Sequence, residues 1–256
     1  MAQPPPAPAT TTVSLAVRGP YGVVAYLSFL AVFGYALGFL ANAGVPKGID
    51  DGADGPVGLA IGVNAGLMGL FAVQHSVMAR PRFKRWLTRL IAPPIERSTY
   101  VLAASVVVAL LLWQWRPLPA TVWSVDAGWA VTLLLTLKAL GVLLIVGSTF
   151  AAGHFKMFGV RQALTRARTR ADGARFRRSR LFWVVRHPIM VGFLIAFWAA
   201  PQMSAGRLLF NVLATGYILV AVRLQERDLR MHFGEPYEQY MRQVPRFIPR
   251  FAHHAR

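Results

Sequence analysis

Long blocks of apolar residues, separated by short charged stretches, constrain this chain more than any other feature of its sequence. A helix needs about 20 apolar residues to cross the hydrocarbon core of a bilayer, and several blocks reach that length. Hydrophobic residues make up 55% of the 256 residues, more than a soluble domain of this size usually carries. The sequence therefore predicts an all-α integral membrane protein.

We predict about five to six transmembrane helices, at residues 21–41, 57–78, 99–115, 130–150, 188–200 and 207–223. The segment after Pro188 is short for a full crossing, so we expect the last two segments to form a C-terminal helical hairpin. Residues 1–18 are rich in Pro, Ala and Thr and are predicted to be disordered. Residues 19–256 are predicted to form one membrane-embedded domain, with a cofactor-binding part at about 183–250 that ends in a cytoplasmic tail.

The net charge of +18 lies mainly between the apolar blocks, in loops 79–98 and 154–186. Loops rich in Lys and Arg stay in the cytoplasm, and two spans separate these two loops. This places both termini in the cytoplasm. Anionic lipid head groups are the natural partners of such loops, so we expect no nucleic-acid partner.

Cysteine is absent from the chain, which excludes disulfides, thiolate metal sites and cysteine nucleophiles. The six histidines are scattered, and no carboxylates repeat at ligand spacing. We therefore predict no dedicated metal site.

The segment RHPIMVG begins the most unusual part of the chain, which runs from Arg186 to Pro249. Pro188 disfavours a helical conformation for the residue before it. This places His187 at the mouth of a helix amino terminus, where unpaired amides attract anionic or polar groups. For the HP pair taken alone, a surface histidine before a helix-starting proline is the better explanation.

Charged residues continue the last apolar helix into water, and an aromatic tail follows. Gln225 and Glu226 lie where this helix emerges, and charge at membrane depth usually faces a partner or a cavity. The large side chains of the tail include Tyr237, Tyr240, Phe247 and Ile248. Such a wall suits an adenine ring and a ribose, and it also suits plain packing. We interpret the region as a cofactor pocket at the membrane surface.

The whole stretch, RHPIMVG followed by ER, DL and HFGEPYEQYMRQVPRFIP, resembles the carboxy-terminal signature of the isoprenylcysteine carboxyl methyltransferase family. It covers about a quarter of the chain. The chain departs from the family pattern at Met190, where that family commonly has Tyr. This difference puts one aromatic wall of the site in question. The segments QHSVMARPRFKRWL and GHFKMFGVRQAL resemble the branch that contains the methanethiol S-methyltransferases and the NnrU-like membrane proteins.

This resemblance implies an S-adenosylmethionine-dependent methyltransferase that converts methanethiol to dimethyl sulfide by in-line transfer. His187 and Pro188 match the first family motif, and Glu226 matches its acidic helix position. The implied cofactor-binding residues are Arg186, His187, Pro188, Gly192, Gln225, Glu226, Tyr237, Tyr240, Phe247 and Ile248.

A histidine on the acceptor side would help this transfer, because a free thiol is mostly protonated at neutral pH. His75, His154 and His187 all lie near predicted cytoplasmic ends of spans. We predict that His75, supported by Gln74, lines the acceptor pocket with the other two nearby; a histidine bonded to backbone at the interface fits His75 as well. The predicted substrate-binding residues are Asn64, Phe71 and Met78, and an interhelical hydrogen bond explains Asn64 equally.

Three other functions fit the same motifs. The first is methyl transfer to another acceptor, such as an isoprenylcysteine carboxylate or a phospholipid. The second is an NADPH-dependent enzyme, because sterol reductases resemble this chain in their HP pair and their Tyr/Pro-rich tail. The third is a non-catalytic NnrU-like membrane protein. We expect the protein in the inner membrane of a bacterium, with its active site facing the cytoplasm.

Overall fold

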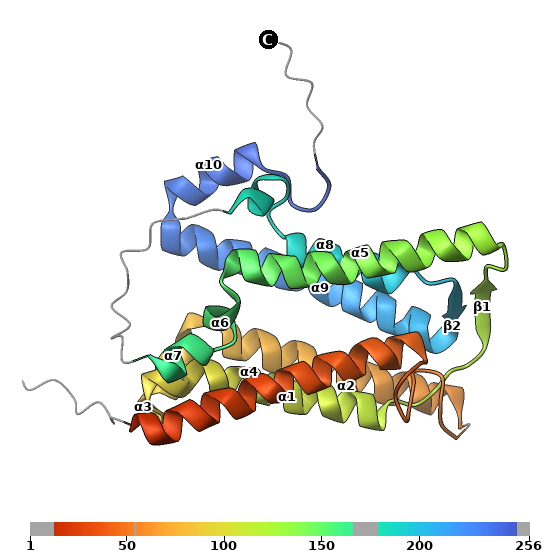
Figure 1. Cartoon of the computed structure of the whole chain (residues 1–256), viewed down its shortest axis with the longest axis horizontal. Coiled ribbons are helices and arrows are strands. Elements are labelled where there is room, and N and C mark those ends of the chain that lie inside the picture. The colour runs from red at the N-terminus through yellow and green to blue at the C-terminus, as the bar shows by residue number, and fades with distance from the viewer. Residues whose placement is uncertain (1–12, 54, 166–178, 250–256) are drawn as a thin grey trace, which may run out of the picture.

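The computed structural model describes residues 13–53, 55–165 and 179–249, which form a bundle of long helices (Figure 1). The helices are α1 (Leu15–Ala41), α2 (Val57–Ala79), α3 (Pro81–Leu90), α4 (Pro93–Gln114), α5 (Gly128–Ala152), α6 (His154–Met157), α7 (Val160–Leu164), α8 (Pro188–Trp198), α9 (Ala205–Phe233) and α10 (Glu235–Gln243). A 3-10 turn, η1 (Arg180–Trp183), precedes α8, and the strands β1 (Thr121–Ser124) and β2 (Gln202–Ser204) pair antiparallel.

The described residues include five helices that are long and apolar enough to cross a membrane: α1, α2, α4, α5 and α9. Their outward faces carry exposed apolar side chains such as Leu27, Val73, Leu133 and Leu143, as contact with lipid requires. The shorter apolar helix α8 forms the predicted hairpin with α9. The prediction of an all-α integral membrane protein is therefore confirmed.

Several element ends differ from the predicted spans. Helix α1 begins at Leu15, inside the segment that the sequence predicted to be disordered, and residues 1–12 lie outside the described part. Helix α4 begins at Pro93, because proline suits the first turn of a helix, where its missing N–H costs nothing. Helix α9 continues without a break to Phe233. The single domain over residues 19–256 stays a prediction.

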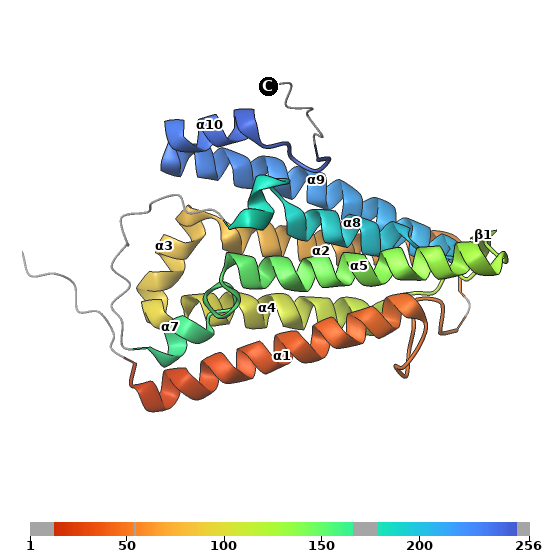
Figure 2. The same ribbon diagram turned by 45° about the horizontal axis from the view of Figure 1, so that its top comes forward.

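The two ends of the bundle carry different secondary-structure elements (Figures 1 and 2). Helices α3, α6, α7 and α10 gather at one end, which we call the motif end. The strands and the loop after α1 gather at the other, which we call the strand end. The described parts of the two basic loops therefore meet at the motif end, as the charge pattern predicted.

Close glycine contacts fix α8 against α5, its main neighbour. A Cβ atom added to Gly192 would lie 2.7 Å from the carbonyl oxygen of Gly141, and one added to Gly141 would lie 2.8 Å from the carbonyl oxygen of Gly192. Only glycine lets two helix backbones approach this closely. Gly192, a predicted cofactor residue, thus has a packing role that explains it.

The main apolar core lies toward the strand end. Its buried members are Phe39, Ile49, Met68, Leu111, Leu112, Trp115 and Ala214. A separate small core of Tyr237, Tyr240 and Val244 holds α10 against the end of α9. The main apolar core thus lies toward the end of the bundle opposite the predicted site.

Candidate active site

Glu226 is the centre of a buried ionic cluster at the motif end. Its side chain is only 2% exposed. The guanidinium Nε of Arg186 donates to Oε1 at 2.9 Å, and Nε2 of His187 lies 2.9 Å from the same oxygen. Nη2 of Arg246 donates to Oε2 at 2.5 Å. We call these four residues the Glu226 cluster; it joins the start of α8, the part of α9 at the motif end and the tail.

Backbone contacts make the same connection between the tail and the start of α8. Nη1 of Arg186 donates to the carbonyl oxygens of Met241 and Val244, at 2.9 and 2.5 Å. The backbone N–H of Arg186 donates to the carbonyl of Pro245, and that of His187 to the carbonyl of Arg246. The tail therefore folds back onto the start of α8, and Arg186 is its anchor.

Helix α8 begins inside this cluster, with His187 as its N-cap and the fully buried Pro188 at its first position. The next amides, those of Ile189 and Met190, have no intrahelical acceptor because they belong to the first turn. The amino terminus of α8 and the guanidinium of Arg246, whose side chain is 38% exposed, offer donors to an anionic group.

The two tail tyrosines are buried rather than open to a ligand. Tyr237 and Tyr240 lie in the small core, and the Tyr240 hydroxyl donates to the carbonyl of Phe182 at 2.6 Å. Burial, with the nearby charge of Glu226, raises the pKa of Tyr237 to about 12. Phe247 lies beside His187, with 6.1 Å between ring centroids, and Ile248 is 80% exposed.

His75 stands in a second cluster, which is aromatic. Its Nε2 shares a hydrogen bond of 2.7 Å with the hydroxyl of Tyr100. The ring centroids of Phe71 and Tyr100 lie 5.1 Å from that of His75, and that of Tyr217 lies 6.4 Å away. Nδ1 of His75 is buried and has no hydrogen-bond partner among the described residues. We call these four residues the His75 cluster.

Gln74 and Met78 lie beside this cluster and contact each other. Nε2 of Gln74 donates to Sδ of Met78 at 3.1 Å, while Oε1 of Gln74 is buried without a partner in the described part of the chain. At the end of α2, Arg80 forms an ion pair of 2.8 Å with Asp228. The predicted acceptor residues of α2, apart from Asn64, are therefore brought together and held against α9.

Helix α9 lies between the two clusters and contributes a residue to each, Tyr217 to one and Glu226 to the other. At 100° per residue, Glu226 projects about 180° away from Tyr217. Gln225 lies between them, about 80° from Tyr217 and about 100° from Glu226. The residues of this intermediate stripe that lie deeper in the bundle, including Asn211, Ala214 and Ile218, are buried, but Gln225 is exposed. The core-facing side of α9 is thus open at the motif end, between the two clusters.

Comparison with known proteins gives this arrangement a family. The family model described as NnrU protein matches residues 65–235. Methanethiol S-methyltransferase 2 of Bradyrhizobium diazoefficiens is 50% identical over 90% of this chain and 89% of its own length. The chain belongs to the methanethiol S-methyltransferase family. The resemblance stated from the sequence is confirmed.

Two further proteins are similar to this chain. The methanethiol S-methyltransferase of Mycobacterium tuberculosis is 49% identical over 90% of this chain and 94% of its own length. Nurim of Pan troglodytes is 30% identical over 64% of this chain and 66% of its own length. No solved structure matches the chain.

His154, another of the predicted catalytic residues, forms hydrogen bonds through both ring nitrogens. The Thr149 hydroxyl donates to the carbonyl of Val146, so it accepts from Nδ1 of His154, 2.7 Å away. Nε2 then accepts from the hydroxyl of Tyr26 at 2.8 Å. Burial lowers the pKa of His154. This geometry gives His154 the role of joining α1 to the end of α5.

Asn64, a predicted substrate residue, is not brought together with His75. It lies eleven residues earlier on α2, about 16 Å along the helix axis. Its side-chain amide donates to the carbonyl of Arg116 at 2.8 Å and accepts from the N–H of Arg116 at 2.9 Å. Both polar groups of the amide are satisfied by one backbone residue of the connection after α4, a structural hydrogen bond close to the interhelical one that the sequence left open.

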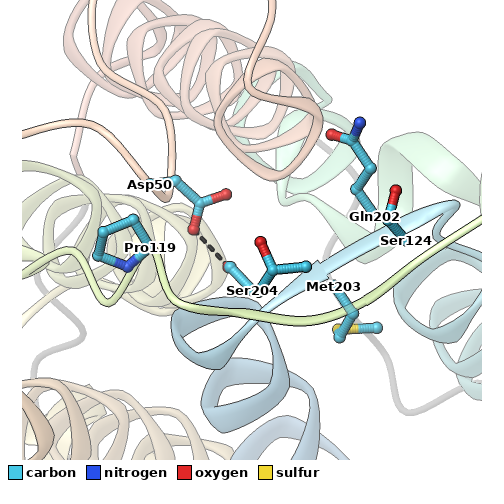
Figure 3. A pocket seen from close by; sticks show the side chains of 7 residues that line it. Asp50, Pro119, Ser124, Gln202, Met203 and Ser204 are labelled. Atoms are coloured by element: carbon cyan, nitrogen blue, oxygen red, sulfur yellow. Dashed lines mark hydrogen bonds between the residues drawn. The ribbon is translucent and has the colours of Figure 1, made fainter.

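A polar recess of about 210 Å³ lies at the strand end, remote from both clusters (Figure 3). Asp50 reaches across it to the Ser204 hydroxyl and also accepts from the side chain of Asn42. Gln202 and Ser124 line its other side. These contacts tie the loop after α1 to the turn between α8 and α9, so we assign this recess a structural role.

The sequence did not single out three residues that complete the clusters. Tyr100 and Tyr217 surround His75, and Arg246 is a partner of Glu226. Arg246 lies inside the motif VPRFIP and could have been found by asking which cation neutralises Glu226. The tyrosines carried no comparable signal, because each is one aromatic residue in an apolar span.

Proposed function

We propose that this protein methylates methanethiol to dimethyl sulfide with S-adenosylmethionine as the methyl donor. The observation that carries the proposal is the 50% identity, over nine-tenths of the chain, to a protein named methanethiol S-methyltransferase. The two clusters at the motif end support it, because they offer a charged side for a cofactor and an apolar side for a small thiol.

The donor fits the opening around Gln225. S-adenosylmethionine supplies a methyl group bound to a positively charged sulfur, together with a carboxylate, an ammonium and an adenosine. The free amides at the start of α8 and the guanidinium of Arg246 suit the carboxylate. The exposed amide of Gln225 suits the polar edges of the adenosine, and the ring of Phe247 offers it an apolar face. Glu226 holds these groups in place rather than contacting the donor itself.

The acceptor side suits a small apolar thiol. The rings of Phe71 and Tyr217 and the thioether of Met78 give the surroundings of His75 an apolar character. Nδ1 of His75 is a buried polar atom there that lacks a partner among the described residues. A thiol S–H placed at Nδ1 would complete its hydrogen bonding, and the orientation of the bound thiol would favour transfer.

The motif end is proposed to face the cytoplasm of a bacterium, at its inner membrane. The residues Arg82, Arg85 and Arg89 are exposed on α3, beside the exposed side chains of Trp86 and Leu90. An amphipathic helix of this kind lies in the membrane interface, with its cations toward anionic lipid head groups. This placement follows the positive-inside rule.

Calorimetry and a product assay test the function together. The purified protein in detergent is titrated with S-adenosylhomocysteine and, separately, with NADPH, and dimethyl sulfide is then measured in the headspace over protein, donor and methanethiol. We expect binding of S-adenosylhomocysteine alone and formation of dimethyl sulfide. Binding of NADPH alone would transfer the protein to the reductases. Binding of neither compound to folded protein would favour a non-catalytic function.

A further inference from the structure

We infer that Tyr100 is a positioning residue for the methyl transfer: it fixes the ring of His75 so that Nδ1 receives the proton of the acceptor thiol. The inference rests on the proposed function and adds a residue that the sequence motifs did not indicate. It assigns different tasks to the two nitrogens of His75, one turned toward the protein and the other toward the substrate.

The geometry around His75 distinguishes the two nitrogens. Nε2 lies 2.7 Å from the Tyr100 hydroxyl, whereas Nδ1 is buried and unpartnered among the described residues. A neutral imidazole carries its proton on one nitrogen and accepts at the other. With the proton on Nε2, the ring donates to Tyr100 and leaves the lone pair of Nδ1 free. Once Nδ1 is protonated, Nε2 still carries its proton, so the bond to Tyr100 persists through the reaction.

Tyr100 is itself held firmly, as a positioning residue must be. It is 6% exposed on α4. The guanidinium carbon of Arg97 lies 4.8 Å from the centroid of its ring, and Nε of Arg97 donates to the carbonyl of Met157. The phenol is therefore stacked under a cation that is anchored to α6.

The chemical step balances with the groups named. The sulfur of methanethiol forms a bond to the methyl carbon as the bond from that carbon to the sulfonium sulfur breaks. The thiol proton passes to Nδ1 of His75. The products are dimethyl sulfide, S-adenosylhomocysteine and a charged imidazole, which then releases its proton to water. No oxidant, reductant or further reactant is required.

The test compares Tyr100→Phe with wild type, with Tyr26→Phe as the matched control, since the Tyr26 hydroxyl also bonds to Nε2 of a histidine, His154. We expect Tyr100→Phe to lower kcat about tenfold at pH 7, the size expected for one hydrogen bond. The deficit should shrink toward pH 9.5, because more of the thiol is then ionised and needs no base. In His75→Ala, adding Tyr100→Phe should cause no further loss, since Tyr100 acts through His75.

A second readout needs no donor and no turnover. Nitrogen NMR of protein labelled in histidine reports which ring nitrogen of His75 carries the proton, and we expect Nε2 in wild type and a mixture of tautomers in Tyr100→Phe. Additive losses in the double variant, a pH-independent deficit, or a proton on Nδ1 in wild type would each overturn the inference. The wild-type protein is assayed first. If it forms no dimethyl sulfide, the proposed function fails, whatever the variants show.

Discussion

The Glu226 cluster and the His75 cluster lie on opposite faces of α9, and they are held by different forces. Glu226 is bonded to two arginines and a histidine, and its carboxylate has both oxygens occupied. His75 is surrounded by rings and keeps one nitrogen free of partners in the described structure. In the first cluster both carboxylate oxygens have hydrogen-bond partners, whereas in the second one ring nitrogen has none among the described residues.

This difference separates structural polar groups from reactive ones. A buried carboxylate that is fully paired stabilises the arrangement of α8, α9 and the tail, and removing it leaves buried cations without compensation. A buried nitrogen without a partner is costly unless a ligand completes it. We propose that the Glu226 cluster builds the cofactor side and that the His75 cluster acts on the acceptor. It also makes the two separable by mutation.

Glu226→Ala should have the largest effect of the variants considered. Breaking a buried ion pair costs about 3–5 kcal/mol, so we expect S-adenosylhomocysteine to bind at least a hundredfold more weakly, measured by calorimetry. Glu235→Ala is the control, because the pair of Glu235 with Arg242 is largely exposed and such pairs contribute little. Undiminished binding in Glu226→Ala would mean that the Glu226 cluster does not build the cofactor side.

His75→Ala should lower kcat by about a hundredfold, the low end for loss of a general base, and should leave the affinity for S-adenosylhomocysteine unchanged. The physical reason is that His75 lies on the other face of α9 from the Glu226 cluster. Headspace measurement of dimethyl sulfide checks kcat, and calorimetry on the same preparation checks the affinity for S-adenosylhomocysteine. Unchanged turnover, or weakened cofactor binding, would erase the distinction between the clusters.

The ion pair of Arg80 with Asp228 should have a smaller effect, because both side chains are partly exposed. It holds the end of α2 against α9 and thereby sets the position of the His75 cluster relative to Gln225. We expect Arg80→Gln to lower kcat/KM about threefold to fivefold, in line with about 1 kcal/mol for such a pair. The charge-exchanged double variant Arg80→Asp, Asp228→Arg should recover part of the loss; a double variant worse than both singles would contradict the role.

His154 should give the smallest effect, on stability rather than activity. Its pKa is lowered in the folded protein by burial and is near 6.5 when unfolded. Above pH 6.5 the residue is neutral in both states; as the pH falls below 6.5, the unfolded chain takes up the proton first, so stability is lost. We expect His154→Gln to show a shallower fall of Tm between pH 7.5 and 5.5 than wild type.

A matched control for this measurement is His232→Gln, because His232 is exposed at the end of α9. Its Tm should fall with pH as in wild type. An equal fall in wild type and His154→Gln would show that the lowered pKa of His154 has no part in acid sensitivity.

The sequence alone determined the class of the protein and which basic loops lie together at one end of the bundle. Apolar blocks of membrane length fix the number of long helices within narrow limits, and the distribution of Arg and Lys fixes which loops share a side, since both depend on composition along the chain. The motifs around His187, Glu226 and Tyr237 gave the family for the same reason.

Only the tertiary structure decided which residues meet across helices. Helical periodicity relates residues of one helix, as with Tyr217, Gln225 and Glu226, but it does not specify the partner that a neighbouring helix presents. The pairing of Arg246 with Glu226, of Tyr100 with His75 and of Tyr26 with His154 therefore followed from packing. That packing gives the three histidines different surroundings: His187 contacts Glu226, His75 contacts Tyr100, and His154 lies between Thr149 and Tyr26.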